Sequence, residues 1–83
     1  MKVRYLAWMK RTVGVPDEEV TPPADVKTVG DLVAWLRHRS AGHAEALAEG
    51  AAFGAAVDQR TATFDVPIAG VREVAFFPPF TGG

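Results

Sequence analysis

The segment from Thr28 to Leu36 reads TVGDLVAWL, and it carries the clearest structural signal in this chain of 83 residues. Thr28 is a favourable N-cap, and Asp31 stands three residues later, where its side chain can bond back to the start of a helix. The apolar residues recur at the i, i+3, i+4 and i+7 positions of one helical face: Val29, Leu32, Val33 and Leu36. This pattern predicts an amphipathic helix over residues 29 to about 39, with Gly42 as a signal for its end.

Short segments with the composition of strands flank this helix on both sides. We expect strands over residues 2–9, 18–22, 55–59 and 73–77, a short extended piece over 64–68, and a second, shorter helix over about 43–49. Pro78 and Pro79 end the last strand, because proline cannot donate to a sheet. Strands on either side of one long helix predict an α+β fold, in which the helix packs across one face of a mixed sheet.

Composition limits the classes of function. The chain is long enough for one domain, and its formal charge is −1, with basic residues scattered rather than clustered. A nucleic-acid partner is therefore not expected, since phosphate binding needs concentrated positive charge. The sequence has no cysteine, no apolar stretch of membrane-spanning length and no apolar signal segment after Met1, so we expect a cytoplasmic protein without a thiol nucleophile or a membrane partner.

Side chains suited to catalysis or metal binding are few. His38 and His43 stand near predicted helix ends, and we expect both to be solvated or to cap a helix. The acidic run at residues 17–19 is expected to form a solvated loop or sheet edge. We expect no metal site, and the predicted reactive group is the main-chain carboxylate of Gly83.

The C-terminal segment, residues 74–83, reads VAFFPPFTGG and differs from an ordinary tail. Pro78 and Pro79 stiffen the chain as it leaves the last strand. Residues 79 to 83 can then extend about 16–18 Å, and Gly82 and Gly83 can enter a narrow pocket because they have no side chains. We therefore expect a folded domain over residues 1–79 and a flexible tail over 80–83; the alternative is a frayed end without function.

This ending resembles that of the small, sulfur-carrying subunit of molybdopterin synthase (MoaD type), within the ubiquitin-like β-grasp group. Looser matches lie at residues 28–32 and 56–59, so the resemblance spans essentially the whole chain. The family usually has Asn where Asp58 stands, an Asp-Gly-Asp-Glu turn where residues 70–73 read GVRE, and a smaller residue at Phe80. The resemblance implies a ubiquitin-like β-grasp fold.

The resemblance also implies a function without independent catalysis. An activating enzyme similar to ubiquitin E1 would adenylate the Gly83 carboxylate with ATP, and a sulfur donor would convert it to a thiocarboxylate. The tail would then enter the large synthase subunit and donate sulfur to cyclic pyranopterin monophosphate. No cofactor is expected on the carrier itself.

The same resemblance suggests a partner-binding surface. Leu6 and Phe77 are expected to form an exposed apolar patch, and Pro78, Pro79, Phe80 and Thr81 are expected to lead the tail into the partner. The alternative is that Leu6 and Phe77 belong to the core, as apolar strand residues usually do.

Three other functions remain open from the sequence. A carrier for thiazole synthesis shares the terminal Gly82-Gly83, although such chains are typically shorter and lack the Phe-Phe-Pro-Pro segment. A protein modifier would use the same activation and join Gly83 to lysines. An interaction domain with an inert tail would not need Gly83 at all.

Overall fold

The computed structural model describes residues 1–79, which form five strands and three short helices. In chain order they are β1 (Lys2–Tyr5), α1 (Trp8–Val13), β2 (Asp17–Glu19), α2 (Val29–Leu36), α3 (Ala41–Ala46), β3 (Gly54–Val57), β4 (Arg60–Ala62) and β5 (Glu73–Phe77).

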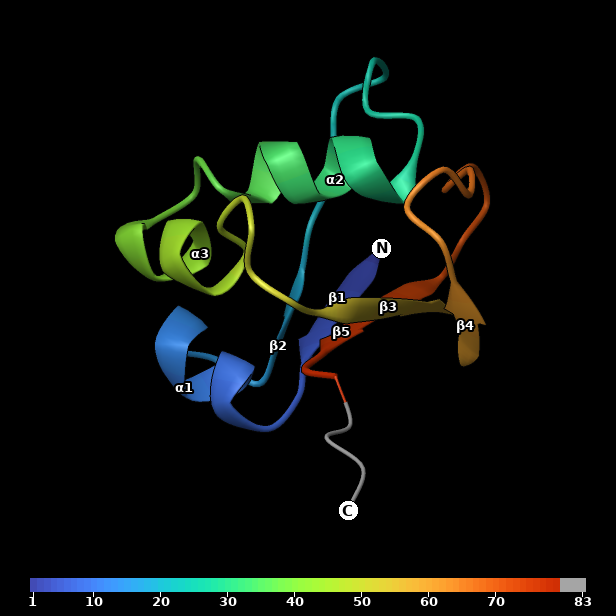
Figure 1. Ribbon diagram of the computed structural model, residues 1–83. Coiled ribbons are helices and arrows are strands. Elements are labelled where there is room, and N and C mark those ends of the chain that lie inside the picture. Colours follow the sequence, from blue (N-terminus) through green and yellow to red (C-terminus); the bar gives the residue numbers. More distant parts are fainter. Residues whose placement is uncertain (80–83) are drawn as a thin grey trace.

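The five strands form one mixed sheet in the order β2-β1-β5-β3-β4. β1 and β5 are parallel, and the other neighbouring strands are antiparallel. Helix α2 lies across one face of this sheet, while α1 and α3 lie together at one end (Figure 1). The prediction of a mixed sheet with one main helix across a face is confirmed.

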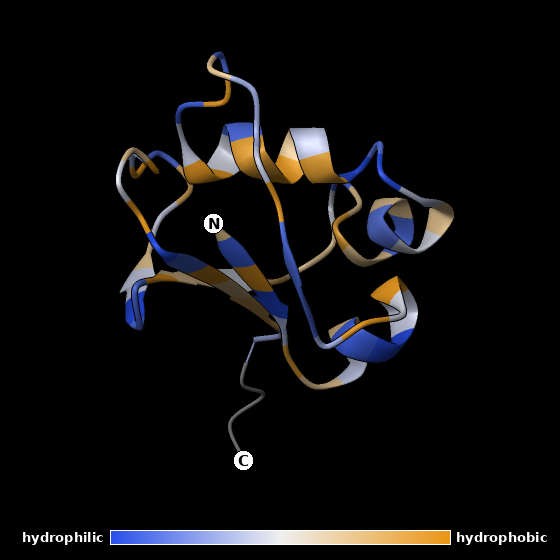
Figure 2. Cartoon of the chain, turned by 180° about the vertical axis from the view of Figure 1, so that it is seen from behind, coloured by the Kyte–Doolittle hydropathy of each residue, from blue (hydrophilic) through white to orange (hydrophobic). Residues whose placement is uncertain are grey.

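The core lies between α2 and the sheet. Alternate strand residues point toward the helix, because successive side chains of a strand face opposite sides. Val3, Tyr5, Val74 and Phe76 are at most 1% exposed, and all four stripe residues of α2 are buried. The side of α2 that faces the sheet is accordingly the hydrophobic side (Figure 2).

The start of α2 is as predicted, but its end is not. Thr28 accepts a hydrogen bond from the Asp31 amide, and the Asp31 carboxylate accepts one from the Thr28 amide, which forms a complete capping box. The helix ends at Leu36 and not near residue 39, and Gly42 does not end it. Gly42 lies inside α3, where a Cβ would come within 2.4 Å of the Thr12 carbonyl oxygen in α1. Glycine at this position allows α1 and α3 to pack closely against each other.

The first strand is shorter than predicted. β1 ends at Tyr5, Ala7 has a φ of 54°, and α1 begins at Trp8. The helical turn places Met9 in the core, and Gly14, with a φ of 105°, ends the helix. The whole of residues 2–9 has the composition of a strand, which explains the longer prediction. In the structure a helical turn, and not the alternation of a strand, brings Met9 into the core.

The remaining strands differ in detail. β2 covers Asp17–Glu19 rather than 18–22. β3 ends at Val57, because Asp58 and Gln59 adopt positive φ and turn the chain into β4, which was not predicted. Residues 64–68 form no strand, but they pair with the start of α2: an isolated bridge joins Thr28 to Pro67, and the Gly30 amide donates to the Phe64 carbonyl oxygen at 2.8 Å. β5 has the predicted bounds.

Candidate functional site

The segment that leads into the tail starts from the middle of the sheet. β5 lies between β1 and β3 and ends at Phe77. The Leu6 amide donates to the Phe76 carbonyl oxygen at 3.0 Å on one side, and Gly54 is the register partner of Phe77 on the other. The chain leaves this point on the side of the sheet away from α2 (Figure 1). The exit point is therefore fixed by both neighbouring strands.

No helix within residues 1–79 covers the face of the sheet opposite α2 (Figure 1). On this open face, Ala56 of β3 pairs with Ala75 of β5, and both are only partly buried. Arg4 of β1 lies beside them, with its guanidinium 3.6 Å from the Glu73 carboxylate. The centre of the open face is therefore flat and apolar, with an ion pair at its side.

Leu6 and Phe77 lie at the point where the chain leaves this face. Leu6 is 38% exposed and Phe77 is half-buried, so neither belongs to the buried core. Pro78 is half-buried and Pro79 is exposed. Phe80, Thr81, Gly82 and Gly83 lie outside the described residues, as does the predicted tail. That any of these residues binds a partner stays a prediction.

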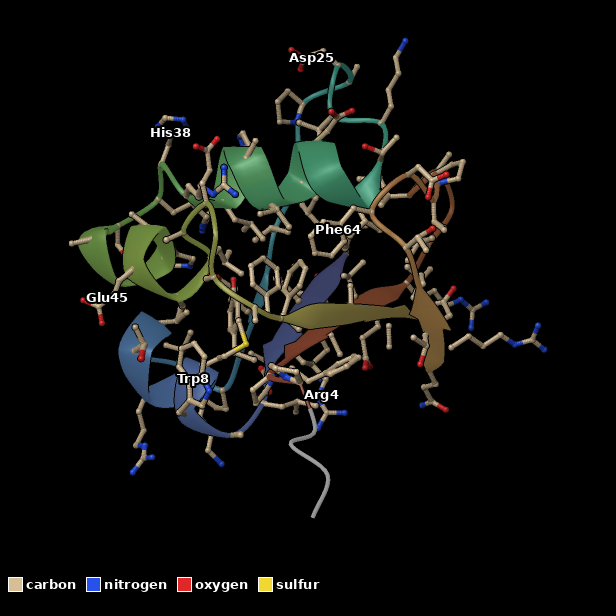
Figure 3. The ribbon with its side chains drawn as sticks, in the orientation of Figure 1. Arg4, Trp8, Asp25, His38, Glu45 and Phe64 are labelled. Carbon is tan, nitrogen blue, oxygen red and sulfur yellow. The ribbon has the colours of Figure 1, made fainter. Side chains whose placement is uncertain are left out.

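The roles of two further residues were not anticipated from the sequence. Trp8, expected to lie on the first strand, is 39% exposed at the start of α1 and lies at the same end of the molecule as Arg4 (Figure 3). Gly54 carries the ring of Phe77 over its backbone. A glycine in a strand often marks such a close approach, and that signal could have identified it.

His43 and Glu18 are placed differently from the prediction. His43, expected to be solvated or capping, is 7% exposed, and its Nε2 lies 2.6 Å from Oε2 of Glu18. The same carboxylate oxygen accepts from the Tyr5 hydroxyl at 2.7 Å, and Nδ1 of His43 lies 2.7 Å from Oγ of Ser40. The acidic run is thus only partly solvated, since Glu18 turns inward from β2. His38 is exposed, as expected (Figure 3).

The protonation of this cluster follows from its contacts. Burial by itself raises the pKa of Glu18, but hydrogen bonds with His43 and Tyr5 outweigh it and leave the pKa below its ordinary value. Burial, followed by the bond to Glu18, raises the pKa of the Tyr5 hydroxyl. Every polar group of the cluster is paired within the protein, which is the arrangement of a structural network and not of an open catalytic site.

Residues 1–79 show neither a metal site nor a membrane-spanning helix. Among residues 1–79, no group of three or more His, Cys, Asp or Glu side chains is arranged to hold a metal ion. Within the same range no helix is long and apolar enough to cross a membrane.

Known proteins with similar sequences belong to the family that the C-terminal segment resembles. Residues 3–83 match the ThiS family. The chain is 41% identical to the molybdopterin synthase sulfur carrier subunit of Escherichia coli K12 over 83 residues, which cover 100% of this chain and 99% of that protein.

Two solved structures are similar over nearly the whole chain. One is a candidate molybdopterin converting factor, subunit 1, from Pyrococcus furiosus, with a TM-score of 0.73 and 27% identity over 95% of each chain. The other is SAMP1 from Haloferax volcanii, with a TM-score of 0.73 and 23% identity over 100% of this chain and 98% of that one. These similarities confirm the predicted ubiquitin-like β-grasp fold.

Proposed function

Because the chain belongs to the ThiS family, we propose that it is the sulfur carrier subunit of a molybdopterin synthase. The observation that carries the proposal is the similarity to the E. coli sulfur carrier subunit, which covers both chains from end to end. The fold supports it, since β5 delivers Pro78 and Pro79 away from the sheet at its open face.

The proposed cycle acts on the carboxylate of Gly83. A carboxylate is a poor electrophile, so an activating enzyme similar to ubiquitin E1 joins it to AMP from ATP and releases pyrophosphate. A sulfur donor then displaces AMP and leaves a thiocarboxylate. The large synthase subunit receives the tail, and the thiocarboxylate sulfur is transferred to cyclic pyranopterin monophosphate. All three reactions would take place in the cytoplasm.

In this proposal the carrier contributes position and not side-chain catalysis. The polar cluster around Glu18 is internally paired, with Tyr5 and His43 buried, on the α2 side of the sheet. The carrier would bind its partner through a surface made of Leu6, Phe77, Pro78, Pro79, Phe80 and Thr81. Gly82 and Gly83 would enter the partner. Holding the reacting group in place is itself a large contribution to rate.

The test is the intact mass of the protein after incubation with ATP, a sulfur source and the activating enzyme. We expect one oxygen to be replaced by sulfur, mapped to Gly83, and the sulfur to be lost on adding the large subunit and pterin precursor. A variant that lacks Gly83 is the control, with unchanged folding and no sulfur. An unchanged mass of the full chain beside a competent activating enzyme would leave an interaction domain as the better account.

The same experiment separates the other carrier and modifier functions. Conjugates to lysine that survive thiol treatment would indicate a protein modifier. Sulfur that is acquired but not lost to the large subunit and pterin precursor would indicate a carrier for another synthesis, such as that of thiazole.

A further inference from the structure

On the open face, Gly54 of β3 makes an unusually close contact with Phe77, the last residue of β5. Gly54 and Phe77 are directly opposite each other in the antiparallel pair of β3 and β5. A Cβ added to Gly54 would lie 2.6 Å from Cε1 and 2.8 Å from Cζ of Phe77. Carbon atoms in favourable contact are about 3.5–4.0 Å apart. The Phe77 ring therefore occupies the space that any other residue at position 54 would fill.

The backbone of Gly54 does not itself require glycine. Its φ lies outside the positive range, unlike those of Gly14, Gly50 and Gly70. Glycine in a strand is unfavourable, because it loses more backbone entropy on folding and has no side chain to pack. The feature that Gly54 supplies is thus the absence of a side chain under the Phe77 ring.

The ring and the backbone of Phe77 are both constrained at this point. Pro78 restricts the residue before it to extended conformations. On the other side of β5, the Leu6 amide holds the Phe76 carbonyl oxygen. With its ring lying over Gly54, Phe77 is half-buried and so remains partly accessible.

We propose, on the basis of the proposed function, that Gly54 is a positioning residue for the binding of the carrier to its activating enzyme. It allows the Phe77 ring to lie low across β3, so that the ring continues the flat surface of Ala56 and Ala75 beside the exposed Leu6. A partner surface that is itself flat and apolar fits this arrangement, and aromatic side chains at the centre of an interface contribute strongly to affinity. A side chain at position 54 lifts the ring and spoils the fit without touching the reacting carboxylate.

The test compares Gly54→Ala with the wild type in steady-state thiocarboxylate formation by the activating enzyme. We expect KM for the carrier to rise at least about fivefold, which corresponds to about 1 kcal/mol of lost binding. We expect kcat to stay within about twofold, because the tail that reacts is unchanged. Assays are run below the melting temperature of both proteins, so that a stability change alone does not alter KM.

A second variant separates displacement of the ring from general damage to the sheet. Leucine at position 77 lacks the Cε1 and Cζ atoms that a Cβ at position 54 would strike. In a Phe77→Leu background, Gly54→Ala should therefore add less than about twofold to KM, as expected for two residues that act through one contact. Additive effects of the two substitutions would overturn the proposal, as would a wild-type KM for Gly54→Ala.

Failure of the proposed function would look different. If the chain is not a sulfur carrier, the wild type acquires no sulfur and no KM can be measured for any variant; if it serves another synthesis, the wild type acquires sulfur but does not lose it to the large subunit and pterin precursor. The inference alone fails when the wild type is active and Gly54→Ala matches it. The ring position can be followed independently by the NMR shifts of the Phe77 ring protons, which we expect to move in Gly54→Ala and not in a variant lacking Gly83.

Discussion

Nε2 of His43 lies 2.6 Å from Oε2 of Glu18, although the two residues are 25 positions apart in the chain. The contact joins α3 to the edge strand β2. Arg39 lies 3.4 Å from the other carboxylate oxygen of Glu18, and the Tyr5 hydroxyl bonds to the first. One carboxylate thus links three separate segments of the fold.

Replacing this carboxylate should destabilise the protein. In Glu18→Ala, the Tyr5 hydroxyl and the His43 ring lose their partner in a largely buried place, so we expect the free energy of unfolding to fall by about 2–3 kcal/mol. Asp17→Ala is the matched control, since Asp17 is exposed on the same strand and should change stability by less than about 0.5 kcal/mol. Urea denaturation measures both, and equal losses would contradict the assigned role of Glu18.

The same contacts predict how stability depends on pH. The pKa of Glu18 is lowered in the folded protein, so its contribution is present above the unfolded pKa of about 4.3 and is lost as pH falls through the lower folded value. We expect the melting temperature of the wild type to fall more steeply below about pH 4.3 than that of Glu18→Gln. Thermal melts from pH 6 to pH 2 test this, and parallel curves would contradict it.

Gly42 should be intolerant of even a methyl group. Alanine normally favours a helix over glycine by about 1 kcal/mol. Here its Cβ would meet the carbonyl oxygens of Thr12 and Val13 at 2.4 and 3.0 Å, and backbone atoms cannot move away as a flexible side chain can. We expect the clash to prevail and Gly42→Ala to lose about 1–3 kcal/mol, measured by thermal melting. A stabilised variant would show that α1 and α3 are not packed this closely.

Asp58 is expected to accept asparagine but not alanine. Its Oδ1 accepts hydrogen bonds from the amides of Arg72 and Glu73, and its φ is 47°. Asn retains an acceptor oxygen and tolerates positive φ, whereas Ala does neither as well. We expect Asp58→Ala to lose about 1–2 kcal/mol and Asp58→Asn less than about 0.5 kcal/mol in denaturant titrations. Similar losses in both variants would assign the effect to charge and not to these bonds.

The elements that the sequence predicts well are those with local signals. The start of α2 follows from Thr28 and Asp31, and the end of β5 follows from Pro78. Two of the three departures from the family pattern, Asp58 and residues 70–73, meet in the bonds described above. Neither position alone indicates this contact, because the residues are 14 and 15 positions apart.

The elements that the sequence does not predict depend on tertiary contacts. β4 is three residues long, and it is a strand only because it pairs with β3. The end of β1 is decided by Met9, whose place in the core requires a helical turn. Glu18 and His43 look like surface residues until β2 and α3 are brought together. Such positions carry no periodicity that a window of sequence can reveal.

The central place of β5 has a consequence for how the protein is made. β5 is the last strand among residues 1–79, yet it lies between β1 and β3. Without it the sheet would separate into two strand pairs, β1 with β2 and β3 with β4. A chain emerging from the ribosome therefore cannot complete its sheet until β5 has been synthesised, and its decisive pairings are the non-local ones that form slowly. Because Pro78 follows β5 directly, completion of the sheet also fixes the point from which the C-terminal segment leaves the domain.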